Sequence, residues 1–218
     1  VQTCALPILR RSLDCYRAQV GRIRLVEVPR LQHLMIDGRG DPDGEAFALA
    51  IAALYPLAYA IKLASKRELD RDYVVMPLEG LWWADDMGAF TSARDKAAWH
   101  WTLLMVVPDW IDADALEAGR RQVAARGVPA RLDDIRLEAL EEGRCAQTLH
   151  IGAFDDEAPT LAHLHDAWIP ERGLEMTGRH HEIYLSDARR VPPERRRTIL
   201  RQPVRAATPG RAGSRGSA

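Results

Sequence analysis

The chain has 218 residues, enough for one domain or for two small fused repeats with a buried core. Its 30 basic residues nearly balance 31 acidic ones, and the net charge of -1 indicates no general attraction to nucleic acid or to an anionic membrane. The sequence contains no apolar run of about 18 residues that would indicate a membrane span. The 3 cysteines lack metal-ligand spacing and favour a reducing, cytoplasmic location.

The two ends of the chain differ in composition from the rest. Residues 1–21 carry a short apolar run followed by arginines, so we interpret them as an extension that is partly non-native or disordered. Residues 205–218 are rich in Gly, Ser, Ala and Arg, and we expect a disordered tail there. The folded domain is therefore expected over residues 22–204.

The first half of this domain begins with strands and continues into a helix. Loose alternation over residues 24–40 predicts two short strands joined by a turn. Asp41 then resembles an N-cap, with Pro42 in the first helical turn. Apolar residues at helical spacing predict an amphipathic helix over residues 43–64, which Pro56 should bend.

Further elements follow by the same rules. Asp112 should cap a linking helix over residues 112–126, which Gly127 and Pro129 end. Asp156 can cap a second amphipathic helix. Its buried stripe would be Leu161, Leu164 and Trp168. The other predicted strands are residues 73–83, 99–107, 135–139, 144–151, 175–186 and 196–202, with a polar loop over 84–98.

The order of elements indicates an internal duplication. Residues 32–53 and 146–168 share one plan: apolar strand, glycine, acidic N-cap with a nearby proline, then amphipathic helix. The prediction is an α+β fold of two βαββ repeats, at about residues 22–110 and 130–204, joined by the linking helix. We expect one antiparallel sheet with helices on one face and a central ligand cleft.

One late segment carries the most informative polar pattern. Read as a strand, residues 180–187 place His180, Glu182, Tyr184 and Ser186 on one face. That face sets a carboxylate beside a phenol, which can hold a cation or take up a proton. A solvated face of an antiparallel sheet is the alternative interpretation.

Aromatic side chains supply candidate ligand contacts. Trp82 and Trp83 are adjacent on a strand and point to opposite faces, so one can be core while the other lines a cleft, meets a partner or is exposed. Tyr55 and Tyr59 lie four apart and form one stripe on the first helix. The alternatives are that helices cover both tryptophans and that the tyrosines form a core rim.

The histidines do not converge as metal ligands would. His163 and His165 lie two apart on a helix, and His180 and His181 are neighbours on a strand, so each pair diverges. The sequence has no HExxH, no paired CxxC and no glycine-rich phosphate loop. We therefore expect no metal and no cofactor.

Three segments, in this order along the chain, resemble the stand-alone branch of the GyrI-like family. They are LMIDGRGDP at residues 34–42, YVVMPLEGLWW at 73–83 and HHEIYLSD at 180–187. The resemblance covers about residues 22–204. It implies two βαββ repeats around a central cleft that takes small, often lipophilic molecules. One departure is Ala188, where the family pattern has Pro, which alters a turn.

The resemblance also implies roles for particular residues. The family includes effector-binding domains of multidrug-responsive activators, in which a Glu-x-Tyr glutamate lies at the floor of an aromatic pocket, and Glu182 and Tyr184 match that setting. The branch also includes enzymes that hydrolyse the strained cyclopropane of DNA-alkylating natural products. About twenty residues precede the first strand here, too few for the helix-turn-helix of the activators, so no direct nucleic-acid binding is expected.

The resemblance suggests one enzymatic function and two alternatives. As a hydrolase, the chain would use Glu182 as general base and Tyr184 as its hydrogen-bond partner. The alternatives are a non-catalytic binder that sequesters hydrophobic or cationic drugs, and a protein-interaction module of gyrase-inhibitor type. The expected partner is a small lipophilic or cationic molecule, and the sequence indicates no oligomeric state. The candidate ligand-binding residues are Trp82, Trp83, Tyr55, Tyr59, Glu79 and His180.

Overall fold

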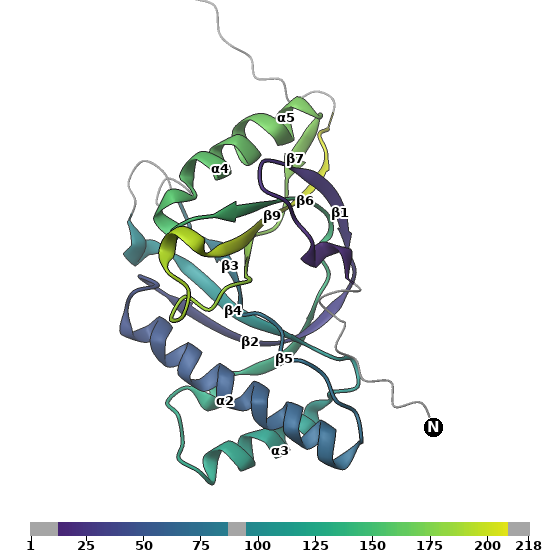
Figure 1. The fold of residues 1–218 in the computed structure, drawn as a ribbon, viewed down its shortest axis with the longest axis vertical. Coiled ribbons are helices and arrows are strands. Elements are labelled where there is room, and N and C mark those ends of the chain that lie inside the picture. Colours follow the sequence, from purple (N-terminus) through teal and green to yellow (C-terminus); the bar gives the residue numbers. More distant parts are fainter. Residues whose placement is uncertain (1–12, 87–94, 209–218) are drawn as a thin grey trace, which may run out of the picture.

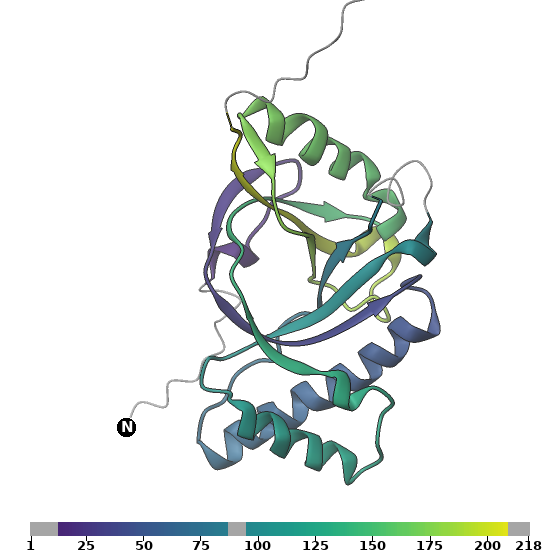
Figure 2. The same ribbon diagram turned by 180° about the vertical axis from the view of Figure 1, so that it is seen from behind.

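A computed structural model describes residues 13–86 and 95–208. Its nine strands form one strongly curved sheet in the order β1-β6-β9-β8-β3-β4-β2-β5, with β7 paired to β9 (Figures 1 and 2). Every strand pairing is antiparallel. The strands are β1 Arg24–Val28, β2 Leu31–Arg39, β3 Glu79–Trp83, β4 His100–Val107, β5 Arg136–Leu140, β6 Gly143–Ile151, β7 Leu174–Met176, β8 His180–Tyr184 and β9 Arg197–Ala206.

The helices gather at two ends of the sheet. α2 and α3 pack together at one end, and α4 and α5 lie at the other (Figure 1). A π-helical segment joins α4 to α5, which is an uncommon geometry that recurs at functional sites. The helices are α2 Glu45–Glu68, α3 Ala113–Ala124, α4 Ala158–Ala162, the π-helix His163–Trp168 and α5 Ile169–Glu171.

The strand order confirms the predicted α+β fold of two repeats. The first repeat runs β1-β2-α2-β3-β4, and the second runs β5-β6-α4-β8-β9. Exchanging the repeats, β1 for β5, β2 for β6, β3 for β8 and β4 for β9, reproduces the sheet order read backwards. The two halves meet where β3 pairs with β8, at the centre of the sheet. A pseudo-two-fold relation therefore places this junction at the interface of the repeats, where ligand sites commonly form.

Several predicted boundaries are corrected by the structure. α2 begins at Glu45 after an N-cap at Gly44, and Asp41 instead accepts a hydrogen bond from the amide of Asp43 at 2.9 Å, which closes the turn before the helix. Of the predicted strand over residues 73–83, only β3 joins the sheet. Likewise, the strand predicted over residues 175–186 is interrupted between β7 and β8, where Gly178 has a φ of 61°.

The second helix also differs from its prediction. Its N-cap is Glu157, not Asp156, and neither side chain caps it. Leu164 is buried as predicted, whereas Leu161 and Trp168 are half-buried, and the π-helical turn changes the spacing between Leu164 and Trp168. Asp112 does cap α3, where its side chain accepts a hydrogen bond from the Ala115 amide at 2.9 Å.

The apolar composition of α2, the longest described helix, reflects its burial in the core. By length and composition α2 could cross a membrane, a test that core helices of soluble proteins also pass. Leu54, Leu57 and Ile61 of α2 are fully buried and pack in one cluster with β2, β4 and α3. In the described residues α2 is therefore a core helix of the folded domain.

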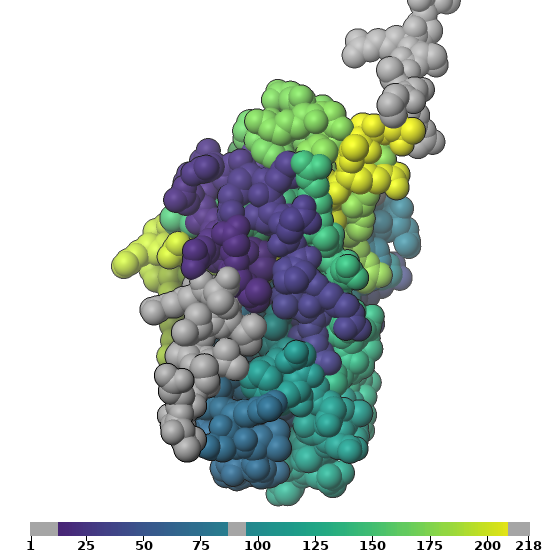
Figure 3. Space-filling view, turned by 90° about the vertical axis from the view of Figure 1, so that its right-hand side faces the viewer, coloured from purple at the N-terminus to yellow at the C-terminus, as the bar shows by residue number. Residues whose placement is uncertain are grey.

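The N-terminal segment contributes to a second core cluster. Cys15 and Tyr16 are buried with Val26, Leu149 and Ile183. Figure 3 shows the N-terminal part of the chain, in purple, spread over one face of the molecule. The stretch from residue 13 onward is thus packed against the sheet. Cys4 and part of the predicted 84–98 loop lie outside the described residues.

Candidate functional site

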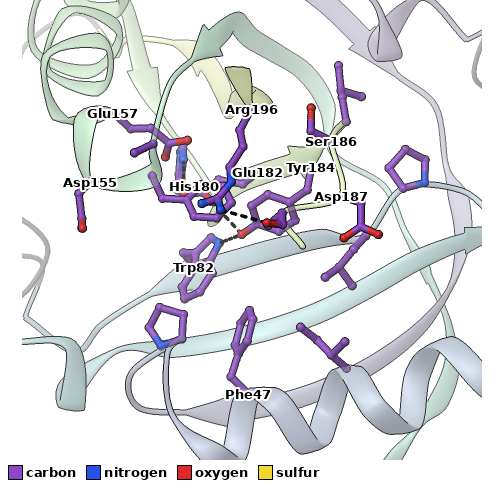
Figure 4. A pocket seen from close by; sticks show the side chains of 18 of the residues that line it. Phe47, Trp82, Asp155, Glu157, His180, Glu182, Tyr184, Ser186, Asp187 and Arg196 are labelled. Atoms are coloured by element: carbon purple, nitrogen blue, oxygen red, sulfur yellow. Dashed lines mark hydrogen bonds and ion pairs between the residues drawn. The ribbon is translucent and has the colours of Figure 1, made fainter. Parts of the chain in front are cut away.

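A large cleft opens between α2, the junction of β3 and β8, and the segment around α4 (Figure 4). Its volume is about 1610 Å³, above the roughly 300–1,000 Å³ of most small-molecule sites. Side chains of α2 and of the segment around α4 line it together with Trp82 and Glu182 of the sheet. Most of its lining is apolar or aromatic, including Phe47, Ile51, Tyr55, Trp82, Trp99, Phe154, Leu161 and Tyr184.

Glu182 lies on the floor of this cleft. The Tyr184 hydroxyl donates a hydrogen bond to Glu182 Oε2 at 2.8 Å, and the Trp82 indole nitrogen donates to the Tyr184 oxygen at 3.1 Å. The Glu182 side chain is 14% exposed. Burial, and then the charge of Glu182, raises the pKa of Tyr184 well above its ordinary value. The phenol therefore stays protonated and holds the carboxylate in one orientation.

Gly80 makes this arrangement sterically feasible. In the β3–β8 pair Gly80 lies opposite Glu182. A Cβ atom at position 80 would lie 2.8 Å from Trp82 Nε1 and 3.0 Å from the Tyr184 hydroxyl oxygen. Only a residue without a side chain leaves room for the tryptophan–tyrosine hydrogen bond across the strand pair.

Rings surround the carboxylate on several sides. Phe47 of α2 stacks on Trp82 with ring centroids 5.9 Å apart, and Trp99 meets Trp82 edge-on at 5.9 Å. Phe154 meets Tyr184 edge-on at 5.5 Å. Aromatic pairs in these geometries pack favourably and exclude water, so the carboxylate faces a weakly polar space.

A second polar group adjoins Glu182. His180 Nε2 lies 3.6 Å from Glu182 Oε1. The ring of His165 packs edge-on against the ring of His180, with centroids 5.3 Å apart. Burial, and then the nearby His180, lowers the pKa of His165 to about 3, so this imidazole is neutral. Glu157 is 4% exposed. Burial, and then the charge of Glu182, raises the pKa of Glu157 to about 10, although Thr198 hydrogen-bonds it.

Sequence reasoning did not identify Glu157 or His165 as site residues. It assigned the acidic run before the second helix to capping, and it considered His165 only as a metal ligand. Their position in the second repeat could have indicated them, because both residues lie near the start of the helix that corresponds to α2 of the first repeat. Phe47 at the start of α2 has the matching place in the first repeat.

The structure brings most predicted site residues together. Glu182, Tyr184, Trp82, His180, Tyr55 and Tyr59 line the cleft, with Tyr59 at its exposed rim. Trp83 does not, because successive strand residues face opposite ways. It stacks on His100 at 5.5 Å, with the Arg179 guanidinium 3.5 Å from its ring centroid.

Glu79 also lies outside the cleft, in a fully buried ionic network on the other side of β3. It accepts a hydrogen bond from Tyr16 and pairs with His181 Nε2 at 2.9 Å. His181 Nδ1 lies 3.0 Å from Glu142, which also pairs with Arg201 at 2.9 Å. Burial opposes the charge of His181, but the two carboxylates outweigh it and raise its pKa to about 9. These groups stabilise the sheet and do not contact the cleft.

No group of three His, Cys, Asp or Glu side chains in residues 13–86 and 95–208 is arranged to hold a metal ion. The polar groups that line the cleft include carboxyl, imidazole, phenol and guanidinium side chains beside aromatic rings.

Comparison with known proteins agrees with this geometry. A conserved protein of Listeria innocua has 36% identity over 90% of this chain and 98% of its own, with a TM-score of 0.82. A hydrolase from Listeria innocua has 35% identity over the same shares, with a TM-score of 0.80. The EcmrR C-terminal domain shares the fold, at 11% identity over 85% of this chain and 98% of its own and a TM-score of 0.54.

No curated protein matches the chain. The model of the GyrI-like small molecule binding domain matches residues 22–205, nearly the whole described fold. The chain therefore belongs to the GyrI-like family of small-molecule binding domains.

Proposed function

We propose that the protein hydrolyses small lipophilic electrophiles, with Glu182 as the general base. The observation that carries this proposal is a carboxylate among rings at the floor of a large apolar cleft. Tyr184 binds one carboxylate oxygen, and the other faces His180 at 3.6 Å, too far for a hydrogen bond. A carboxylate held in this way beside an apolar space can take up a proton from water as a general base. The related Listeria hydrolase supports the reaction class.

A strained cyclopropane conjugated to a carbonyl is the substrate that this chemistry fits. Water attacks a ring carbon, so a C–O bond forms and a ring C–C bond breaks. The electron pair of the broken bond moves to the carbonyl oxygen, and Glu182 takes the proton that water loses. Trp82 and Phe47 would stack on the flat parts of the substrate. The carbonyl oxygen is finally protonated by solvent.

The hydroxyl of Tyr184 serves the base in this arrangement. It donates a hydrogen bond to Glu182 and so orients the carboxylate. Tyr55 of α2 also lines the cleft, and burial raises the pKa of its phenol, so the group is protonated. Tyr55 is thus the phenol we assign as donor to the carbonyl oxygen during ring opening.

A non-catalytic binder of lipophilic cations is the second candidate. Its support is the same cleft, because a carboxylate among Trp, Tyr and Phe rings attracts organic cations by charge and by cation–π contact. Such a protein would sequester its ligand and release it unchanged.

Two measurements on the same sample separate these functions. The protein is incubated with an activated cyclopropane, tryptophan quenching reports binding, and mass spectrometry reports a gain of one water. We expect quenching together with the hydrated product. Quenching without product would favour the binder, and the absence of both would exclude both candidates.

A further inference from the structure

One corner of the cleft contains buried polar atoms that form no hydrogen bond within the described part of the protein. Among the described residues, Glu157 Oε1, His165 Nε2 and both ring nitrogens of His180 are buried without a hydrogen bond. All three residues line the cleft. Figure 4 shows Glu157, His180 and Glu182 along one wall, above Trp82 and Phe47.

Four buried polar atoms on three residues that line one cleft have no hydrogen-bond partner among the residues that the structure describes. Buried donors and acceptors are nearly always satisfied, because leaving one unpaired forfeits its hydration without compensation. A buried water makes about three hydrogen bonds to groups of this kind. The corner thus has the donors and acceptors that one small hydroxylic molecule needs.

The local backbone holds the corner in shape. The π-helical turn His163–Trp168 carries His165, whose ring meets that of His180 at an interplanar angle of 80°. Edge-on packing leaves the two imidazoles without a hydrogen bond between them. His180 in turn is the immediate neighbour of Glu182 on the same strand face, 3.6 Å away. The corner therefore opens directly beside the proposed base.

We propose that Glu157, His165 and His180 form the site of the water molecule that Glu182 deprotonates. This inference rests on the proposed hydrolysis and adds the positioning residues. The Glu157 carboxyl donates a hydrogen bond to the water oxygen, and the two imidazoles complete the cage. One water hydrogen points to Glu182, which receives the proton as the water oxygen forms its bond to the substrate carbon.

The protonation states of the cage agree with this assignment. Glu157, with its pKa raised to about 10, is a carboxylic acid at neutral pH and can donate a hydrogen bond. His165, with its pKa lowered to about 3, is neutral and offers one donor and one acceptor. Neutral Glu157 and His165 side chains can therefore hydrogen-bond a water molecule beside Glu182.

A high-resolution crystal structure of the full chain tests the site itself. We expect an ordered water within hydrogen-bonding distance of at least two of the three cage residues. A corner closed by direct pairing of the imidazoles, or filled by an apolar side chain, would overturn the assignment whether or not the protein hydrolyses anything.

Product analysis in water–methanol mixtures tests the role of the cage. A His165→Phe variant fills the corner, so we expect turnover of an activated cyclopropane to fall about 10²-fold, with an unchanged dissociation constant and a changed ratio of methanol adduct to hydrate. His165→Asn keeps polar atoms and should recover part of the rate. The matched control is His163→Phe, because His163 is exposed on the same π-helix.

The outcomes separate the two proposals. A wild-type chain that gives no hydrate contradicts the hydrolase, and the crystal structure then decides alone whether the corner binds water. A wild-type chain that gives hydrate, with His165→Phe and His163→Phe both at the wild-type rate and product ratio, overturns the cage.

Discussion

Gly80 determines how closely the rings at the cleft floor can approach. It lies opposite Glu182, and the space that a Cβ atom would need is taken by the Trp82 indole and the Tyr184 hydroxyl. The orientation of the Glu182 carboxylate therefore depends on a residue that itself has no polar side chain.

A Gly80→Ala variant should separate the indole from the phenol. We expect affinity for aromatic ligands to fall and the free energy of unfolding to fall by about 1–3 kcal/mol, the usual cost of overpacking. Gly119→Ala is the control, because a Cβ there would lie 2.7 Å from Ile61 in the core, away from the cleft. Equal ligand affinity in wild type and Gly80→Ala, measured by tryptophan quenching, would contradict this role.

Glu157 should make stability depend on pH. Its pKa rises from 4.5 in the unfolded chain to about 10 in the folded protein. Between these values the folded protein keeps a proton that the unfolded chain has released, so the free energy of unfolding decreases as pH rises. The slope for one proton is at most about 1.4 kcal/mol per pH unit.

A Glu157→Gln variant lacks this titration. Its melting temperature relative to wild type should rise steadily between about pH 5 and pH 9. The pKa of His181 is raised to about 9, so its charge also stabilises the fold less as pH rises toward that value. This effect is the same in both proteins and cancels in the difference of melting temperatures. A constant difference in melting temperature over this range would show that Glu157 is not held protonated.

At the level of single residues, the sequence identified part of the site. Period-two alternation was sufficient to place Glu182, Tyr184 and His180 on one strand face. It could not decide between Trp82 and Trp83, because either register is compatible with an apolar strand. Glu157 was not found because its burial depends on packing between repeats, which local pattern does not report.

At the level of elements, β3, β8 and β9 are joined by charges as well as by backbone hydrogen bonds. His181 lies between Glu79 and Glu142 with 1% of its side chain exposed, and Arg201 completes the network. Buried carboxylates are tolerated only while such partners neutralise them. This network fixes β8 against its neighbours and so sets the position of Glu182.

Loss of His181 should therefore destabilise the sheet. A His181→Ala variant leaves two buried carboxylates without their shared cation, and we expect a loss of about 3–5 kcal/mol at neutral pH in chemical denaturation. His163→Ala, at an exposed position, should change stability by less than about 0.5 kcal/mol. A loss below about 1 kcal/mol for His181→Ala would mean that the network contributes little.

Element prediction succeeded where hydrophobic periodicity was long and uniform. A helix was predicted over residues 43–64 because the apolar spacing persists for several turns, and the structure has it at Glu45–Glu68. Asp112 was a correct cap because its side chain reaches the Ala115 amide. It was wrong at residues 73–78, where Tyr73, Met76 and Leu78 pack into the cores although the segment is not part of a strand. It also could not anticipate a π-helical turn, which needs tertiary contacts to be stable.

At the level of the whole molecule, two related halves share one sheet and one cleft. β1 of the first repeat pairs with β6 of the second, and β5 of the second pairs with β2 of the first. Neither repeat completes its sheet without the other, and the junction of β3 and β8 lies at the centre of the shared sheet. The order of elements in the sequence was sufficient to predict the duplication. The exchange of edge strands could not be predicted, because it depends on pairings between strands that lie far apart in the sequence.

The central claim is that Glu182 acts on the bound ligand and is not needed to bind it. The most direct measurement compares turnover of an activated cyclopropane with its dissociation constant in wild type and Glu182→Gln, with Glu175→Gln as a control on β7, outside the cleft lining. We expect Glu182→Gln to keep the dissociation constant and to lose turnover by about 10²-fold or more. Equal turnover in the two proteins, or a loss explained entirely by weaker binding, would contradict the assignment of Glu182 as the base.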